Sequence, residues 1–123
     1  MIKSFKDLEI YQESYQLALE IYKISRGYPP EERYGLTSQI QRCVMSIPLN
    51  IAEGYGKHES AAEFKRYLRM ALGSAQEMKV LIDFSRDLGY MPEGDAARYH
   101  ERYDILAKRI YRTNEKWEKK SSP

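Results

Sequence analysis

Residues 60–89 read SAAEFKRYLRMALGSAQEMKVLIDFSRDLG and carry the longest helical pattern in the chain. Ser60 and Glu63 have the spacing of a capping box, in which the serine hydroxyl accepts from the N3 amide and the glutamate reaches back to the N-cap amide. We expect a helix from there to about Leu88, ended by Gly89 at the C′ position. One face of it repeats at intervals of three and four residues: Phe64, Leu68, Ala71, Ala75, Met78, Ile82 and Ser85.

Two further helices are expected before this one. Residues 7–25 have Asp7 as a suitable N-cap and two adjacent apolar rows, a stripe wider than one partner helix can cover. The next helix should begin at Thr37 as N-cap and end near Gly54, with Leu36, Ile40, Cys43, Ile47 and Ile51 on one face. Pro48 interrupts that pattern without an amide donor, so we expect a kink or break there.

The fourth helix should run from about Asp95 to Lys119, with an apolar row at four- and three-residue spacing: Tyr99, Tyr103, Leu106, Ile110, Thr113 and Trp117. No segment alternates with period two, so no strand is expected. Short connections between four amphipathic helices predict an all-α, antiparallel, up-down-up-down four-helix bundle. We therefore expect one domain over residues 1–120, followed by a disordered tail over residues 121–123.

Composition limits the class of protein. The 123 residues carry a net charge of +2, with 42% hydrophobic and 31% charged residues. No apolar run is long enough for a membrane span, and the first residues do not resemble a signal peptide. The single cysteine, Cys43, cannot form an internal disulfide. These features predict a cytoplasmic protein.

Catalytic and metal-binding patterns are not found in the sequence. Bundle metal sites use Glu-x-x-His pairs, but Tyr55 precedes His58 and Ala97 precedes His100 by three residues. Cys43 falls on an apolar row and is better interpreted as a buried small hydrophobe than as a nucleophile. We therefore expect no metal, no cofactor and no catalytic residues. A small enzyme is the least favoured of three alternatives.

Two ladders of basic residues suggest an anionic partner. One is Lys65, Arg66 and Arg69, and Lys57 precedes it in a glycine-containing turn that could also be an ordinary interhelical connection. The other lies in residues 105–120, which hold six Lys or Arg against two Glu: Lys108, Arg112, Lys116 and Lys120 are four residues apart. Adjacent like charges are mildly destabilising on a helix. Nucleic acid, acidic residues of a neighbouring subunit and a solvated face all remain as explanations.

Two features suggest packing between helices and between subunits. Gly73 lies in the middle of the third helix, where glycine is unfavourable, so we expect a neighbouring backbone to approach it closely. The chain has eleven tyrosines, several on the first and fourth helices. Because tyrosine suits half-buried surfaces, we expect a tyrosine-rich patch that mediates assembly.

Four stretches carry a resemblance to a known family. They are FKDLEIYQ at 5–12, ERYGLTSQI at 32–40, SIPLNIAEG at 46–54 and ALGSAQE at 71–77. Together they resemble the bacterial four-helix-bundle family of 23S rRNA intervening-sequence proteins. The chain is also similar to the related accessory variability protein of diversity-generating retroelements. The family motif includes Pro48, Asn50, Glu53, Gly54, Gly73 and Ser74, and we interpret Asn50 and Glu53 as capping and pairing residues beyond Pro48.

The resemblance implies a ring, usually a homopentamer, without known catalysis. From it and the basic ladders we expect a non-catalytic, homo-oligomeric accessory subunit that binds RNA or DNA and is associated with a ribosome or a reverse transcriptase. The expected contacts are Lys57, Lys65, Arg66, Arg69, Lys108, Arg112 and Lys116. The alternative is an oligomeric protein–protein scaffold that does not bind nucleic acid.

Overall fold

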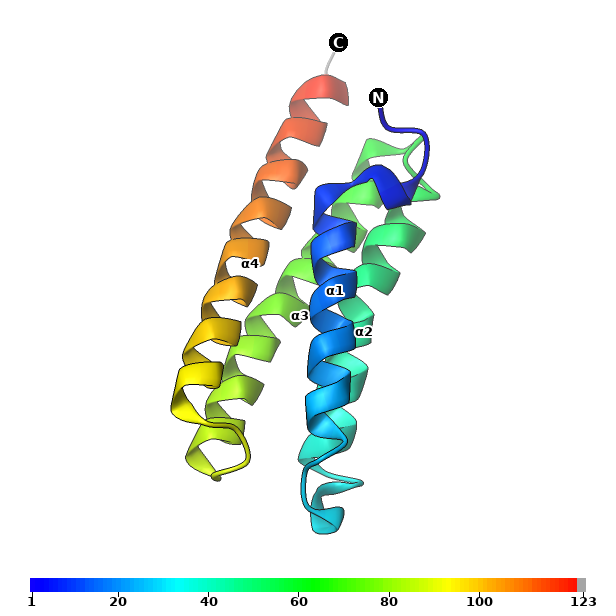
Figure 1. The fold of residues 1–123 in the computed structure, drawn as a ribbon. Coiled ribbons are helices and arrows are strands. Elements are labelled where there is room, and N and C mark those ends of the chain that lie inside the picture. The colour runs from blue at the N-terminus through cyan, green and yellow to red at the C-terminus, as the bar shows by residue number, and fades with distance from the viewer. Residues whose placement is uncertain (122–123) are drawn as a thin grey trace.

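Four helices run up and down beside one another (Figure 1). The computed structural model describes the backbone of residues 1–121 and the side chains of residues 1–117. The helices are α1 (Glu9–Ser25), α2 (Leu36–Tyr55), α3 (Ala61–Asp87) and α4 (Glu93–Ser121), and the short 3-10 helices η1 (Phe5–Asp7) and η2 (Pro30–Glu32) precede α1 and α2. The described residues include no strand, and the all-α four-helix bundle is confirmed. The disordered tail was expected over residues 121–123, but Ser121 is the last residue of α4. Residues 122–123 lie outside the described residues.

The core is built from the apolar rows of all four helices. Every member of the row that begins at Phe64 on α3 is buried, and so are Ile40, Ile47 and Ile51 on α2. Burying one large aliphatic or aromatic side chain contributes about 1.5–3 kcal/mol, so these rows hold the helices together. Across the described residues, no helix is long and apolar enough to cross a membrane.

The helix starts differ from expectation at two places. Asp7 does not cap α1: Ser4 caps η1, and the Asp7 carboxylate accepts from the backbone amides of Lys3 and Ser4 at 2.7 and 3.1 Å. Thr37 does not cap α2, which begins one residue earlier, at Leu36. The carboxylate of Glu32 accepts from the Leu36 amide at 3.2 Å and so replaces the expected cap.

The predicted limits of α3 agree closely with the structure. The Ser60 hydroxyl accepts from the amide of Glu63 at 3.2 Å, as an N-cap should. The other half of the capping box is replaced, because the Glu63 carboxylate binds Arg66 instead. Gly89 follows the C-cap with φ of +83°, a left-handed conformation that favours glycine.

Pro48 does not break α2. The helix continues through it to Tyr55, so the break, one of the two expected outcomes, is wrong. Proline removes one amide donor, but Pro48 is buried on a helix whose neighbouring Ile47 and Ile51 are fully buried, and this packing keeps the helix continuous. The Asn50 side-chain amide donates to the Ser46 carbonyl at 2.8 Å in the adjoining turn.

Gly73 is not a point of close approach. It is exposed, and a Cβ placed on it would meet nothing within 4 Å, so the expected contact with a neighbouring backbone is wrong within the bundle. The close approach is at Gly54 of α2, where a Cβ would lie 2.5 Å from the Cβ of Tyr67 on α3. The glycine that lets α2 and α3 pack closely is therefore Gly54 of α2.

Helices α1 and α4 pack less closely than the other neighbouring pairs and are joined by polar contacts. The Arg102 guanidinium binds both carboxylate oxygens of Glu20 at 2.8 and 3.0 Å, and the Tyr99 hydroxyl donates to the same carboxylate. Further along the same two helices, Arg109 of α4 pairs with Glu13 of α1. The pKa of Glu20 is lowered to about 2, chiefly by the hydrogen bonds from Arg102.

Exposed apolar side chains gather between α1 and α2. A groove of about 430 Å³ is lined almost wholly by apolar and tyrosine residues: Phe5, Tyr11, Tyr15, Ala18, Leu19, Tyr22, Met45, Pro48, Leu49 and Ala52. This agrees with the wide apolar stripe expected on α1. The tyrosines of α4 do not extend it, because Tyr99 and Tyr103 are buried in the core and the exposed Tyr111 lines a different groove, between α3 and α4.

Candidate nucleic-acid interface

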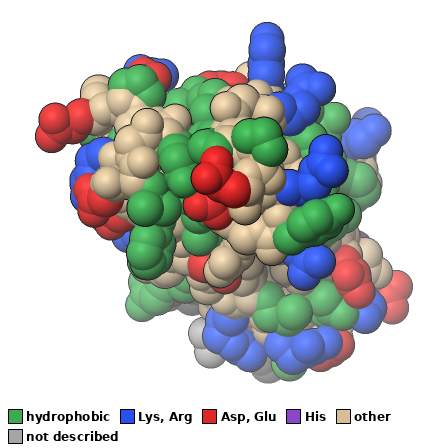
Figure 2. Space-filling model, turned by 90° about the horizontal axis from the view of Figure 1, so that it is seen from below, with side chains coloured by type: hydrophobic (Ala, Val, Ile, Leu, Met, Phe, Trp, Pro, Cys, Tyr) green, Lys and Arg blue, Asp and Glu red, His purple; other side chains and the backbone are tan. Residues whose placement is uncertain are grey.

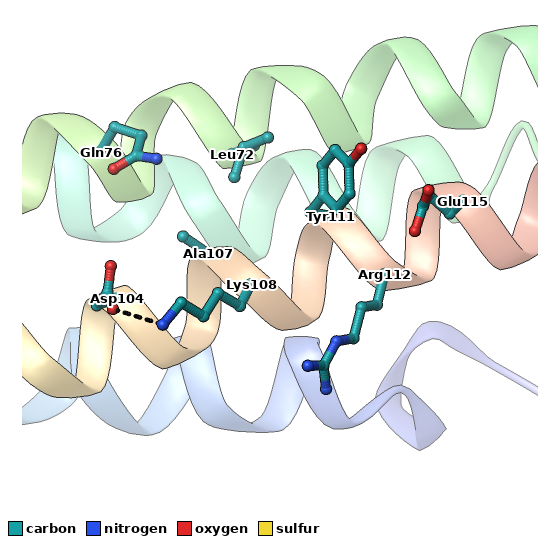
Figure 3. Close-up of a pocket in the computed structure, with 8 residues that line it drawn as sticks. All are labelled: Leu72, Gln76, Asp104, Ala107, Lys108, Tyr111, Arg112 and Glu115. Carbon is teal, nitrogen blue, oxygen red and sulfur yellow. Dashed lines mark ion pairs between the residues drawn. The ribbon is translucent and has the colours of Figure 1, made fainter.

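A groove of about 370 Å³ runs between α3 and α4 (Figure 3). Leu72 and Gln76 of α3 form one wall, and the α4 wall consists of Asp104, Ala107, Lys108, Tyr111, Arg112 and Glu115. Tyr111 is 55% exposed, so its ring forms a large apolar surface in this groove. The groove combines this aromatic ring with two cations, two carboxylates and an amide. Its ring and cations could bind an anionic ligand with flat apolar parts.

The helical repeat of α4 explains this arrangement. Leu106 and Ile110 are buried, so the face of α4 that carries Lys108 and Arg112 points outward. Lys108 and Arg112 lie four residues apart and are neighbours on the surface. Figure 3 shows the Arg112 side chain extending away from α3, and Arg112 also lines a second groove beside the N-terminal segment.

Two acidic residues, Asp104 and Glu115, moderate the charge of this groove. Asp104 accepts from Lys79 of α3 at 2.9 Å and pairs with Lys108 at 3.2 Å. These two hydrogen bonds, Lys79 first, lower the pKa of Asp104 below its usual value. Lys108 is nevertheless 68% exposed, so its ammonium group remains accessible from solvent.

Lys65 and Arg69 extend the cationic surface along α3. The Asn114 amide of α4 donates to the Lys65 carbonyl at 3.1 Å, which fixes this turn of α3 against α4. Arg69 is one turn further and exposed, and no ion pair to it occurs among the described side chains. The next turns of the same face bring Leu72 and Gln76 into the groove. The turn of α3 that carries Lys65 therefore lies beside the part of α4 that carries Asn114.

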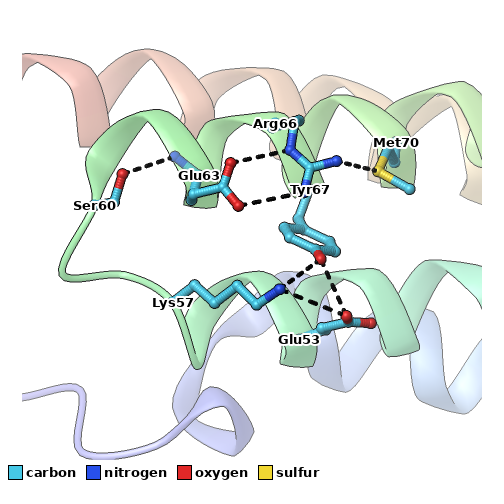
Figure 4. A network of polar contacts seen from close by, with 7 residues as sticks. All are labelled: Glu53, Lys57, Ser60, Glu63, Arg66, Tyr67 and Met70. Carbon is cyan, nitrogen blue, oxygen red and sulfur yellow. Dashed lines mark hydrogen bonds and ion pairs between the residues drawn. The ribbon is translucent and has the colours of Figure 1, made fainter.

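Lys57 and Arg66 belong to a different surface (Figure 4). Lys57 donates to the Tyr67 hydroxyl at 2.8 Å, and that hydroxyl donates to the Glu53 carboxylate at 3.0 Å. Arg66 binds Glu63 at 3.0 Å, and its guanidinium lies 4.6 Å from the centre of the Tyr67 ring. The hydrogen bond with Tyr67 chiefly raises the pKa of Lys57. This network stabilises the α2–α3 turn and uses both cations.

Lys116 lies at the edge of the second groove, which measures about 480 Å³. Arg109, Arg112 and Lys116 form its basic side, and the opposite side includes the acidic residues Asp7 and Glu9. The charge of this groove is therefore mixed, as it is in the α3/α4 groove. Trp117 lies at its edge and packs on the Phe64 ring at 4.6 Å between centroids.

Three of the six motif residues, Glu53, Gly54 and Ser74, lie at the contact between α2 and α3. Glu53 accepts from Tyr67, Gly54 admits the Tyr67 side chain, and the Ser74 carbonyl accepts from the Cys43 thiol at 3.3 Å. Burial, and secondarily the charge of Glu77, raises the pKa of the Cys43 thiol to about 12. A neutral, buried thiol is unsuited to nucleophilic attack. In the part of the chain with described side chains, no three His, Cys, Asp or Glu residues form a metal-binding group.

Sequence reasoning missed Tyr111 and Gln76. Tyr111 falls outside the buried row of α4, between two members of the basic ladder, and that position could have identified it as an exposed aromatic residue. Gln76 carries no signal in the sequence, because an exposed glutamine in a helix is common. Only the packing of α3 on α4 places it in the groove.

Comparisons with known proteins agree with the fold. The family model described as "23S rRNA-intervening sequence protein" matches residues 6–120. A similar solved structure is a crystal structure of a protein with unknown function from the S23 ribosomal protein family of Bacteroides thetaiotaomicron VPI-5482. It is 20% identical, with a TM-score of 0.78, over 86% of this chain and 95% of that one. No curated protein matches the sequence.

Proposed function

The chain belongs to the family of 23S rRNA-intervening sequence proteins, and on that premise we propose that it is a non-catalytic, self-associating bundle that binds RNA or DNA along the α3/α4 groove. One observation supports this most strongly: Lys108 and Arg112 of α4 line one groove together with the exposed Tyr111 ring, and the bond from Asn114 to the Lys65 carbonyl holds the Lys65 turn of α3 beside the same stretch of α4. The fold alone would not support it, since one fold serves many functions.

The chemistry of the groove favours recognition of the nucleic-acid backbone. Lysine and arginine neutralise phosphates regardless of base sequence, and each neutralised phosphate releases condensed counterions. An exposed tyrosine offers a surface on which any unpaired base can stack. The groove should therefore bind with little sequence preference, and its affinity should fall steeply as salt rises.

We propose an accessory role for the protein in the cytoplasm, beside a ribosome or a reverse transcriptase. The family description refers to 23S rRNA, and the expected partner class is structured RNA or the nucleic acid handled by such an enzyme. We further propose that copies associate in a closed ring, most simply five-fold, through the apolar surface of α1 and α2. Assembly multiplies the small net charge of each copy and repeats the groove around the ring.

A protein-only scaffold is the second candidate. It is favoured by the internal partners of three expected contacts, because Lys57, Arg66 and Lys108 each bind groups of the same chain. In that case the apolar groove of α1 and α2 would be the working surface, and nucleic acid would not bind at physiological salt.

Titration of labelled structured RNA and duplex DNA by fluorescence polarisation, at two salt concentrations, separates these candidates. The test variant replaces Lys65, Arg69 and Arg112 by Gln. The matched control replaces Lys3, Lys23 and Arg33 by Gln and so removes the same charge elsewhere. We expect the test variant to bind at least ten-fold more weakly at low salt, with a flatter salt dependence, and the control to resemble the parent. No binding by the parent at low salt would favour the scaffold, and equal loss in both variants would show that binding does not depend on the α3/α4 groove.

A further inference from the structure

The second groove, of about 480 Å³, lies between the N-terminal segment with the start of α1 on one side and the last turns of α4 on the other. These segments lie at the same end of the bundle (Figure 1). At the opposite end, which Figure 2 shows, hydrophobic and charged side chains are interspersed over the surface. The volume of the second groove is within the range of about 300–1,000 Å³ that small-molecule sites occupy. We call it the terminal groove.

Charged side chains of opposite sign line opposite sides of the terminal groove. Arg109, Arg112 and Lys116 come from α4, and Asp7 and Glu9 come from the N-terminal side. The three cations follow one another at three- and four-residue spacing, so they form one row on α4. The groove therefore has a basic rim and an acidic rim instead of one uniform charge.

Some of these charges already have partners within the chain. Arg109 pairs with Glu13 of α1, and the Asp7 carboxylate accepts from two backbone amides of the N-terminal segment. Three others form no ion pair and no side-chain hydrogen bond among the described side chains: Glu9, Arg112 and Lys116. Each rim therefore offers at least one charged group to a ligand.

The surface between the two rims is apolar. Leu8 and Ile10 are 5% and 3% exposed and belong to the core, so they form a firm floor. Trp117 borders the groove on the α4 side, where its ring is held edge-on against Phe64. Ile2, which is 41% exposed, adds apolar surface from the N-terminal segment. A ligand with an apolar body and charged ends matches this arrangement.

We propose that the terminal groove binds a short peptide with free amino and carboxyl ends and apolar side chains. The peptide carboxylate binds Arg112 and Lys116 through charge-assisted hydrogen bonds, which are the strong kind. The peptide ammonium group binds Glu9, and the apolar side chains cover Leu8 and Ile10. A polyanion fits less well, because the carboxylate of Glu9 repels a phosphate and attracts an ammonium group.

The two rims together give the site its selectivity. A ligand with only one charged end leaves the charged group of the other rim without a partner, so ligands charged at both ends are preferred. This inference does not depend on the proposed binding of nucleic acid. The α3/α4 groove shares only Arg112 with the terminal groove.

Calorimetric titration with three forms of one dipeptide tests the assignment. The probes are leucyl-leucine, its N-acetyl form, which lacks the ammonium group, and its amide form, which lacks the carboxylate. Trp117 is the only tryptophan of the chain, so its fluorescence reports whether a probe occupies the terminal groove. We expect leucyl-leucine to bind with millimolar or tighter affinity and to change this emission. Each capped form should bind about ten-fold more weakly.

Two variants, each with a matched control, locate the binding. Glu9→Gln and Lys116→Gln each remove one charge of the groove and should weaken the binding of leucyl-leucine about ten-fold. Glu101→Gln and Lys23→Gln remove the same charges outside the groove and should bind like the parent. All four side chains are exposed, so the fold should tolerate the changes, and circular dichroism verifies the helix content of each variant.

Three results would overturn the assignment. Absence of both heat and a change in Trp117 emission at millimolar leucyl-leucine would exclude the ligand. A capped form that binds as tightly as the free dipeptide would show that one rim is not used. Glu9→Gln or Lys116→Gln binding as tightly as its control would place the binding elsewhere. The titrations contain no nucleic acid, so none of these results bears on the proposed function.

Discussion

Gly54 of α2 lies against Tyr67 of α3 so closely that a Cβ at position 54 would be 2.5 Å from the Tyr67 Cβ. The same tyrosine accepts from Lys57 and donates to Glu53 through its hydroxyl. The Cβ of Tyr67 is therefore held against Gly54, and its hydroxyl is held by Lys57 and Glu53. This contact sets the distance between α2 and α3 near the turn that joins them.

Substitution at this contact should show its energetic importance. Gly54→Ala forces the two helices apart, and overpacking of this kind costs about 1–3 kcal/mol. Gly73→Ala is the matched control, because Gly73 is exposed in mid-helix, where alanine is favoured by about 1 kcal/mol. Urea unfolding should therefore show opposite signs for the two variants. Equal effects would mean that α2 and α3 approach each other elsewhere.

Removal of the Glu20 carboxylate should produce a pH-dependent loss of stability. The pKa of Glu20 is lowered from 4.5 to about 2, chiefly by the hydrogen bonds from Arg102. Because the folded-state pKa is lower than the unfolded one, the stabilisation is complete above pH 4.5 and is lost as pH falls toward 2. The side chains are partly exposed, so Glu20→Gln should cost about 1–2 kcal/mol at pH 7.

Unfolding measured at several pH values checks this expectation. The difference between the parent and Glu20→Gln should shrink steadily below pH 4.5. Glu101→Gln, which alters an exposed glutamate of the same α4 helix, should show little difference at any pH. A Glu20→Gln deficit that stays constant down to pH 2.5 would show that the lost contact is not ionic.

The Cys43 thiol should be nearly unreactive in the folded protein. It is 5% exposed, and burial raises its pKa to about 12, so very little thiolate exists at pH 8. A chromogenic disulfide reagent should label the native chain far more slowly than the urea-unfolded chain. Rapid labelling without urea would indicate that the contact between α2 and α3 opens readily.

Much of the fold could be predicted from the sequence, because helix faces are local patterns. The row from Phe64 to Ser85 is buried as expected, and Gly89 has the expected positive φ. Local signals failed where tertiary contacts take precedence. Packing around Ile47 and Ile51 keeps α2 continuous through Pro48, and Glu32 rather than Thr37 binds the first amide of α2.

The candidate site was less predictable, because it depends on which helices are neighbours. The basic ladders were visible in the sequence, and so was the spacing that lets Glu63 bind Arg66 and Glu53 approach Lys57. The bond between Lys57 and Tyr67 was not, because it joins the end of α2 to α3. Spacing along one helix also could not place Lys65 beside Asn114 of another. Contacts between helices, not patterns within them, decide which cations lie along the groove.

Tyr111 should contribute to binding of single strands. Stacking of one base on an aromatic side chain is worth about 1–3 kcal/mol, so Tyr111→Ala should weaken binding of single-stranded RNA measurably. Tyr111→Phe retains the ring and should bind like the parent. Tyr34→Ala removes a tyrosine that is 90% exposed on the η2–α2 connection and serves as the control. Polarisation titrations in which Tyr111→Ala binds as tightly as the parent would remove the ring from the interface.

The most direct test of the α3/α4 groove is a crosslinking map of the bound nucleic acid. RNA containing 4-thiouridine is bound to the full chain at low salt, irradiated and digested, and the crosslinked peptides are identified by mass spectrometry. We predict crosslinks within residues 65–76 of α3 and 104–115 of α4, with Tyr111 prominent among them. Crosslinks confined to α1 and α2, or none above the level of an unrelated protein, would contradict the account.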